Sequence, residues 1–126
     1  MPRASSEIAF LPPATQEMVR RLLARWNPDK IILFGSYARG TAGPNSDADL
    51  LIVMPIDGPR RPIVAEMYRE IGYVGLPKDL ILVTPEGLER QRDDPGTVIY
   101  PALREGIVLY DRSRRSAQRG AMGRAR

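Results

Sequence analysis

The 126-residue sequence predicts a single α/β domain in which helices pack on a small mixed sheet. Runs of β-branched and aliphatic residues alternate with amphipathic helical patterns along most of the chain. A short excursion joins the first two apolar runs, whereas a helix-length segment joins the second to the third. The first two strands are therefore expected to be antiparallel. The second and third should run parallel through a right-handed crossover, which gives the spatial order first, second, third.

The first long helix is expected over residues 16–26, with Thr15 as its N-cap. Its apolar stripe consists of Met18, Val19, Leu22, Leu23 and Trp26. The proline at position 28 ends this helix, and the apolar run 30–34 follows as the first strand. A short helix over 36–39 should end at the glycine that follows it.

The second strand is expected over residues 48–54, and Pro62 can begin a second long helix. The apolar face of that helix consists of Ile63, Val64, Met67, Tyr68 and Ile71. Residues 78–83 are the third strand, which begins with a carboxylate as the second strand does. These segments complete an alternating α-β-α-β-α-β core.

The C-terminal part should contain two short helices and a final strand. Thr84-Pro85 caps the first of them, which extends to about residue 90. Asp94-Pro95 begins the next, and Pro101 inside it predicts a bend. Its inward residues are expected to be Val98, Ile99, Ala102 and Leu103. Gly106 closes that helix, and a short strand over 107–110 follows it.

The segment from Ile31 to Met54, IILFGSYARGTAGPNSDADLLIVM, carries the chemistry. Gly35-Ser36 ends an apolar strand and begins a helix, which leaves backbone N–H groups available to bind phosphate. Asp47 and Asp49 are two residues apart at the start of the next strand, so their side chains should share a face. Mg²⁺ prefers carboxylate oxygens together with substrate phosphates. The segment therefore predicts a site that moves a nucleotide or phosphoryl group.

An ordinary turn is the alternative for this loop, because Gly, Asn, Ser and Asp are common turn residues. That alternative leaves Asp49 unexplained, since a carboxylate adjoining a buried strand is costly unless it is paired or metal-bound. Asp79 begins the third strand, where the crossover should place it beside Asp49. The alternative for Asp79 is a solvated strand end.

Composition restricts the chemistry further. The chain has no Cys and no His, which excludes disulfides, thiolate and imidazole metal ligands and Ser-His-Asp or Cys-His catalysis. Carboxylate–metal chemistry remains. There is no 18-residue apolar run and no signal-peptide core at the N-terminus, so we expect a cytoplasmic protein that does not enter a membrane.

Residues 15–111 are expected to form the domain, after an N-terminal extension over 1–14 and before an Arg-rich, disordered tail over 112–126. Six of the 19 basic residues lie in the tail and none of the 15 acidic residues does. The rest of the chain therefore carries 13 basic and 15 acidic side chains. The tail is interpreted either as a solubilising terminus or as an electrostatic arm for RNA or an acidic partner.

Gly35-Ser36, ten intervening residues, and Asp47-x-Asp49 in an apolar strand resemble the nucleotidyltransferase superfamily that includes DNA polymerase β. The short length resembles the minimal nucleotidyltransferases, which are commonly paired with a HEPN-domain protein in toxin–antitoxin modules. The similarity extends over roughly residues 15–111. Two positions depart from the family pattern. Tyr37 stands where many relatives carry Arg, and Ala48 is smaller than the usual Ile or Leu.

The resemblance implies a polymerase β-like fold and two Mg²⁺ ions. Asp47 and Asp49 would hold the ions against a nucleoside triphosphate such as ATP. Asp79 matches the third acidic position of the family, where it would help bind the second ion and lower the pKa of the attacking hydroxyl. Gly35 and Ser36 would bind the phosphates.

Two further residues are placed with the nucleotide. Arg39 can add a charge-assisted phosphate contact, with an exposed arginine at a helix end as the alternative. Ser46 is grouped with the nucleotide-binding residues, and its alternative role is to cap the entry to the second strand.

By resemblance, the expected activity is transfer of AMP from ATP to a hydroxyl, with a tyrosine of a HEPN ribonuclease toxin as acceptor and an antitoxin role as the result. One alternative is a non-catalytic antitoxin that binds the toxin without modifying it. Antibiotic nucleotidylation is disfavoured because a second domain is missing. A nucleic-acid-binding module using the Arg tail is disfavoured by the slightly acidic domain. A homodimer and a hetero-oligomer both remain open.

Overall fold

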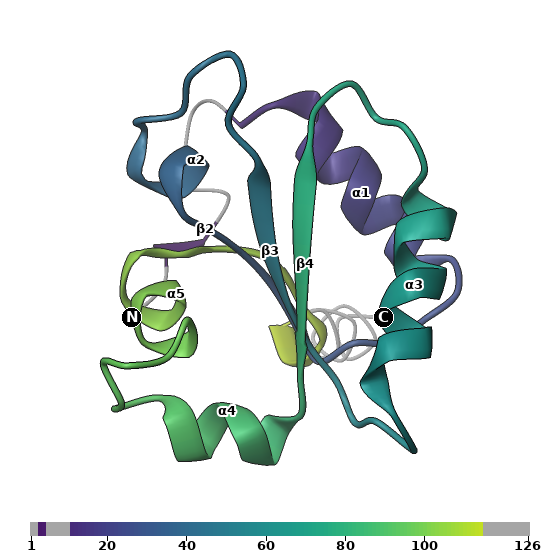
Figure 1. Cartoon of the computed structure of the whole chain (residues 1–126), viewed down its shortest axis with the longest axis vertical. Helices are drawn as coiled ribbons and strands as arrows, with labels where there is room; N and C mark the ends of the chain where they lie inside the picture. The colour runs from purple at the N-terminus through teal and green to yellow at the C-terminus, as the bar shows by residue number, and fades with distance from the viewer. Residues whose placement is uncertain (1–2, 5–10, 115–126) are drawn as a thin grey trace, which may run out of the picture.

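The computed structural model describes residues 3–4 and 11–114, which form a five-stranded mixed sheet with helices on both sides (Figure 1). The elements in chain order are β1 (Arg3–Ala4), α1 (Pro13–Leu23), β2 (Lys30–Phe34), α2 (Ser36–Arg39), β3 (Ala48–Val53), α3 (Arg60–Ile71), β4 (Lys78–Val83), α4 (Pro85–Gln91), α5 (Ile99–Glu105) and β5 (Ile107–Asp111). None of the helices in these residues is long and apolar enough to cross a membrane.

The sheet has the strand order β1-β5-β2-β3-β4. β2 and β3 are antiparallel, and β3 and β4 are parallel with α3 as the crossover between them, which confirms the predicted order of the three central strands. β5 pairs antiparallel with the other side of β2. The sequence does not predict β1, because two residues carry no periodic pattern, yet they pair in parallel with β5.

Two apolar clusters fill the two sides of the sheet. α1 and α3 cover one side, where Met18, Leu22, Met67 and Ile71 pack against alternate residues of β2, β3 and β4. On the other side, α5 and α4 pack against the remaining strand residues, which include Leu51, Val53 and Val83. Because β3 is buried on both faces, it appears in the sequence as a continuous apolar run after Asp49.

The first helix begins earlier than predicted. α1 starts at Pro13 and ends at Leu23, so the predicted span of 16–26 is shifted by about one turn. Thr15 is not the N-cap: it lies inside the first turn, fully buried, and its hydroxyl donates to the Pro12 carbonyl at 2.7 Å. Pro13 is well suited to the first turn because its missing N–H has no helical partner there. The second long helix likewise begins at Arg60, two residues before Pro62.

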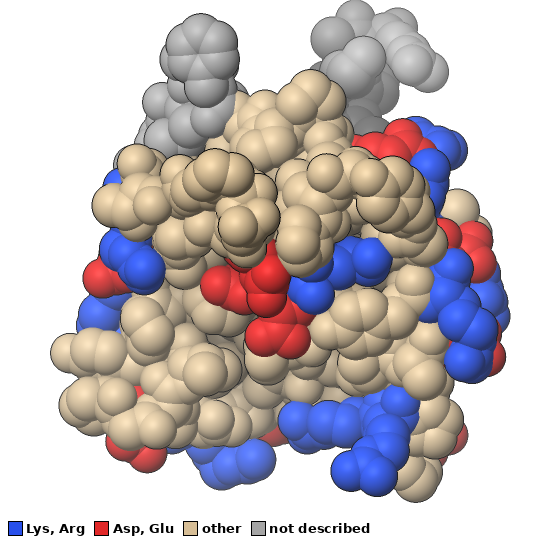
Figure 2. Space-filling view, turned by 45° about the horizontal axis from the view of Figure 1, so that its top comes forward, with Lys and Arg blue, Asp and Glu red and all other residues tan. Residues whose placement is uncertain are grey.

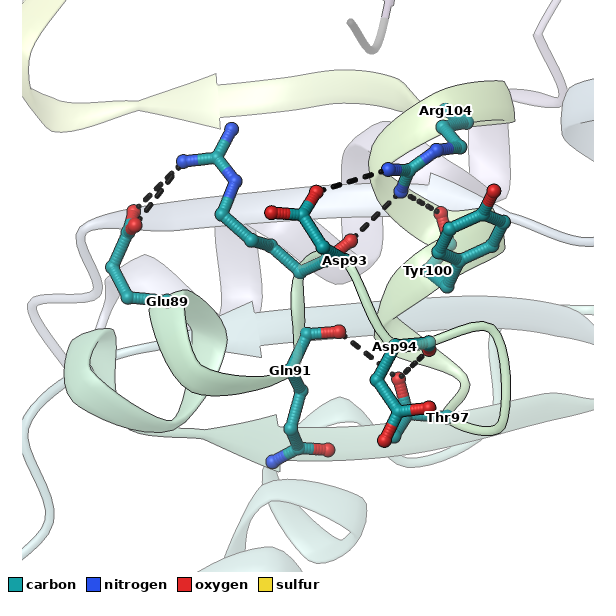
Figure 3. A network of polar contacts seen from close by, with 8 residues as sticks. Glu89, Gln91, Asp93, Asp94, Thr97, Tyr100 and Arg104 are labelled. Atoms are coloured by element: carbon teal, nitrogen blue, oxygen red, sulfur yellow. Dashed lines mark hydrogen bonds and ion pairs between the residues drawn. The ribbon is translucent and has the colours of Figure 1, made fainter.

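The prediction of a helix starting at Asp94-Pro95 is wrong. α5 begins only at Ile99, and Val98, expected to face inward, is 48 % exposed. The Thr97 hydroxyl donates to the carbonyls of Asp94 and Gln91, which holds this stretch in a turn (Figure 3). Pro101 consequently lies in the first turn of the helix, where it needs no bend.

Arg104 of α5 also holds the connection between α4 and α5 in place. Its guanidinium donates to the Arg92 carbonyl at 2.8 Å and to the Asp93 carboxylate at 3.2 Å, and it stacks 3.6 Å from the centre of the Tyr100 ring (Figure 3). The predicted cap of α4 is confirmed, because the Thr84 hydroxyl accepts from the Gly87 N–H at 3.0 Å.

The predictions for the two ends of the chain fall largely outside the described residues. Of the expected extension over 1–14, the structure places Arg3–Ala4 in the sheet and residues 13–14 in α1. Of the expected tail over 112–126, it describes only residues 112–114, which are helical.

Candidate active site

Gly35 lies at the junction of β2 and α2 in a conformation that only glycine adopts readily, with φ of 77° and ψ of −153°. A Cβ atom at this position would lie 2.2 Å from Oδ2 of Asp49 and 3.2 Å from its Cγ. The glycine is therefore required twice, for its backbone angles and for the space that the carboxylate occupies. The backbone that follows β2 thus passes directly against Asp49, the acidic residue of β3.

Asp49 and Asp79 are neighbours in the parallel register of β3 and β4, and Phe34 lies opposite Asp49 on β2. Asp49 is half-buried, whereas Asp79 and Asp47 are exposed. Alternation along β4 places Asp79 on the same face as Ile81 and Val83, the face that α4 and α5 cover farther along the strands. The fold thus brings together the three carboxylates that the sequence marks as candidates.

Their proximity shows in the electrostatics of Asp49. Burial raises the pKa of its carboxyl above the ordinary value of 3.8, and the negative charges of Asp79 and Asp47 raise it further. The positive charge of Arg39 acts in the opposite direction. Asp49 is therefore held among like charges.

The raised pKa predicts how stability depends on pH. The unfolded chain loses the Asp49 proton near pH 3.8 and the folded protein at higher pH, so the stabilising contribution is complete below 3.8 and is lost as pH rises through the folded-state pKa. Metal-free Asp49→Asn should consequently be more stable than the wild type at neutral pH. Urea unfolding of both proteins in a chelator, over a pH series, measures the difference, which should shrink toward pH 4. A mutant that is less stable at neutral pH would show that the carboxylate accepts structural hydrogen bonds.

The other residues predicted to bind the nucleotide, Ser36, Arg39 and Ser46, differ in whether they already have a partner in the protein. The Ser36 hydroxyl forms no hydrogen bond within the described residues, so it is available to a ligand. Arg39 is half-exposed and forms a 3.4 Å ion pair with Glu105 at the end of α5. Ser46 has a local partner, since its hydroxyl accepts from the Gly43 N–H at 2.8 Å and closes a turn. This bond lies within the loop before β3, and both predicted roles of Ser46, nucleotide binding and capping of the strand entry, stay predictions.

Tyr68 of α3 also belongs to this site, although its sequence position predicts only a core residue. Its hydroxyl lies 3.3 Å from Oδ1 of Asp79 and accepts from the Leu80 N–H at 2.9 Å. Burial raises the pKa of Tyr68, and the charges of Asp79 and Asp47 add to the effect although the Leu80 hydrogen bond opposes it. No sequence signal separates Tyr68 from its apolar neighbours, because helical periodicity places all of them on one face.

The donor set suits a divalent cation. Carboxylate oxygens are the ligands that Mg²⁺ prefers, and a cation would offset the burial and the like charges that together raise the pKa of Asp49. Within residues 3–4 and 11–114, no group of three or more acidic side chains is placed so that together they could hold a metal ion. Mg²⁺ usually needs only one or two protein carboxylates and completes its shell with water and substrate phosphates. The residues therefore fit a metal that binds together with a nucleotide.

The end of the sheet where β2 stops and β3 and β4 begin is turned toward the viewer in the space-filling view (Figure 2). Acidic side chains gather at the centre of this face, and basic side chains lie on both sides of them (Figure 2). A central acidic group with basic flanks suits a metal-bound polyphosphate, since the cation binds the carboxylates and the flanks attract phosphate.

Comparison with known proteins identifies the fold. The family of nucleotidyltransferase domains matches residues 16–108, a segment that contains Gly35 and all three candidate aspartates. The chain belongs to this family. The match begins inside α1 and ends inside β5, so it contains every element between them.

A candidate protein adenylyltransferase of Methanocaldococcus jannaschii is 39 % identical to this nucleotidyltransferase over 89 residues, 65 % of this chain. The match spans 58 % of that relative's length. A crystal structure of a toxin–antitoxin with AMP-PNP contains a chain similar to this one, with a TM-score of 0.59, 20 % identity, and coverage of 85 % of this chain and 80 % of that one. A candidate nucleotidyltransferase from Sulfolobus solfataricus has a TM-score of 0.53 at 19 % identity and covers 79 % of each chain. These structural likenesses confirm the polymerase β-like fold.

Proposed function

We propose that this nucleotidyltransferase transfers AMP from Mg²⁺-bound ATP to a hydroxyl group of a partner protein. The proposed acceptor is a tyrosine of a HEPN-domain ribonuclease toxin, which modification would inactivate. The protein would then act as an antitoxin in the cytoplasm. The observation that carries this proposal is the close approach of Gly35 to the Asp49 carboxylate, beside Asp79 on the neighbouring strand.

That approach supports nucleotidyl transfer because it places two requirements of the reaction together. The backbone after β2 can bind phosphate oxygens, and the carboxylates at the start of β3 and β4 can hold the cation that those oxygens also bind. The relatives support the choice of reaction. One carries the name of an adenylyltransferase, and the other belongs to a toxin–antitoxin structure with AMP-PNP.

In the proposed reaction the acceptor oxygen attacks the α-phosphorus of ATP. A new bond forms between that oxygen and phosphorus, the bond to the oxygen bridging the α- and β-phosphates breaks, and pyrophosphate leaves. The hydroxyl proton passes to water. Divalent cations, when bound, stabilise the attacking and leaving oxygens of such an in-line displacement.

The residues of this chain supply binding and orientation. Asp47 and Asp49 would hold the cations against the nucleotide, and Asp79 would help to hold the second cation, on the acceptor side. Gly35 lets the phosphates approach the backbone, and the Ser36 hydroxyl can donate to them. Arg39 would contribute positive charge if the nucleotide draws it away from Glu105, with which it forms only an exposed ion pair.

Isotope transfer tests the reaction directly. The protein is incubated with its cognate helical partner, Mg²⁺ and ATP labelled at either the α- or the γ-phosphate, and the partner is analysed by mass spectrometry. We expect label from the α-phosphate, a mass increase equal to one AMP group, and modification of a tyrosine. Asp57→Asn is the matched control for substitutions in the site, since Asp57 is an exposed carboxylate in the loop after the other end of β3.

Label from the γ-phosphate would indicate a kinase and contradict the proposal. A partner that gains no mass, yet is inhibited equally by the wild type and by Asp49→Asn, would instead establish the non-catalytic antitoxin. If the partner carries AMP on a residue other than tyrosine, the proposed reaction still holds and only the proposed acceptor residue is wrong.

A further inference from the structure

Tyr68 reaches the Asp79 carboxylate from the opposite side of the sheet. It packs with the cluster on the α1 and α3 side, which includes Leu80 and Leu82 of β4. Asp79 alternates with these residues and therefore lies on the other face of the strand. β4 is the edge of the sheet, so the tyrosine hydroxyl extends around an open edge to contact both Leu80 and Asp79.

The direction of the two hydrogen bonds is fixed by their chemistry. The Leu80 N–H can only donate, so the Tyr68 oxygen must accept from it, at 2.9 Å. The single hydroxyl hydrogen is then left to donate to Oδ1 of Asp79 at 3.3 Å. The Leu80 N–H of β4 thus orients the Tyr68 hydroxyl, and this hydroxyl orients the carboxylate of Asp79.

The tyrosine is itself braced. The Lys78 ammonium lies 5.9 Å from the centre of its ring and donates to the Gly72 carbonyl at 2.8 Å, which ties the start of β4 to the end of α3. The ring is partly buried against the core. A braced ring gives its hydroxyl a defined position, and a defined donor restricts the rotation of an otherwise exposed carboxylate.

Among the described side chains, Tyr68 is the only one that hydrogen-bonds to Asp79. Asp47 and Asp49 accept no side-chain hydrogen bond in the same part of the chain, and Gly35 packs against Asp49 instead. The contact engages Oδ1 of Asp79 and leaves Oδ2 for a ligand. Asp49 and Asp79 are therefore held by different contacts, Asp49 by packing against Gly35 and Asp79 by the Tyr68 hydroxyl.

We propose that Tyr68 is a positioning residue that holds the Asp79 carboxylate in the orientation needed on the acceptor side of the site. The expected effect on the AMP-transfer rate rests on the proposed function, whereas the expected effect on Mg²⁺ binding does not. The competing explanation is that the tyrosine only satisfies the Leu80 N–H and protects the sheet edge. The two explanations differ in whether the effect of the hydroxyl depends on Asp79.

Tyr68→Phe removes the hydroxyl and keeps the ring. We expect the Mg²⁺ concentration that half-saturates the thermal stabilisation by ATP to rise about tenfold, the lower end of what loss of a ligand-orienting partner costs. In the AMP-transfer assay, kcat should fall by about the same factor while KM for ATP changes little. Tyr73→Phe is the matched control, because Tyr73 follows α3 by two residues, is 88 % exposed and makes no side-chain hydrogen bond in the described part of the chain.

A double-mutant cycle separates positioning from edge protection. In an Asp79→Ala background, Tyr68→Phe should have no further effect on the Mg²⁺ requirement, because the group that it orients is absent. Edge protection alone would lower the melting temperature in both backgrounds and leave the Mg²⁺ requirement unchanged, which would overturn the proposal. So would AMP attached to Tyr68 itself after incubation of the wild type with Mg-ATP, since the tyrosine would then be an acceptor. If the wild type binds Mg-ATP without transferring AMP, the proposed function fails while the metal titration still decides the role of Tyr68.

Discussion

Asp49→Asn should lower the rate of AMP transfer by about 10³-fold or more. The substitution keeps the shape that packs against Gly35 and removes the charge at the most buried of the three carboxylates. Metal coordination typically supplies several kcal/mol of transition-state stabilisation, and each 1.36 kcal/mol corresponds to a factor of about ten in rate. Single-turnover measurements with α-labelled ATP and the partner protein give the rate directly.

The same preparations provide the controls for this loss. Asp57→Asn should transfer AMP at the wild-type rate, since it makes the identical change away from the site. Thermal scans should show that Mg-ATP raises the melting temperature of the wild type and of Asp57→Asn, and has little effect on Asp49→Asn, because a ligand stabilises only a folded state that binds it. A mutant that keeps more than a tenth of the wild-type rate would exclude Asp49 as a metal ligand.

Gly35→Ala should be the most damaging single-methyl change in the site. The added Cβ would meet the Asp49 carboxylate at 2.2 Å, and the backbone angles lie in a region that is essentially restricted to glycine. We expect the free energy of unfolding to fall by about 3 kcal/mol. Displacement of the carboxylate should also reduce AMP transfer about 10²-fold, because a shift of 1 Å can cost that much. Urea unfolding and the transfer assay measure the two effects separately.

Gly40→Ala is the control for the backbone contribution. Gly40 ends α2 with the same φ of 77°, but its ψ of 19° is in the ordinary left-handed region and no atom lies within 4 Å of the added Cβ. It should cost only about 1 kcal/mol. In an Asp49→Ala background the cost of Gly35→Ala should drop toward the backbone value, since the clashing carboxylate is gone. An undiminished cost in that background would show that the contact with Asp49 does not limit the substitution.

The central strands could be predicted from the sequence because each signal was local. The strands at 30–34 and 78–83 have the predicted bounds, and the connection lengths sufficed for the antiparallel and parallel pairings. The candidate site was predicted in the same way, because the Gly-Ser step and the paired aspartates indicate phosphate and metal binding from their residue types and spacing. Predictions failed where side-chain hydrogen bonds competed with helical periodicity, as with Thr15 and with the Thr97 turn that delays α5.

The sequence by itself determined which residues are candidates to bind metal and phosphate, because Gly35, Ser36, Asp47 and Asp49 are recognisable from type and spacing and Asp79 from its place at the start of the next strand. Only the tertiary structure decided how closely they approach one another and what supports them. The contact of Gly35 with Asp49 joins two strands, and the contact of Tyr68 with Asp79 joins a helix on one face to a carboxylate on the other. Neither follows from a pattern along the chain, since both depend on strand register and on packing across the sheet.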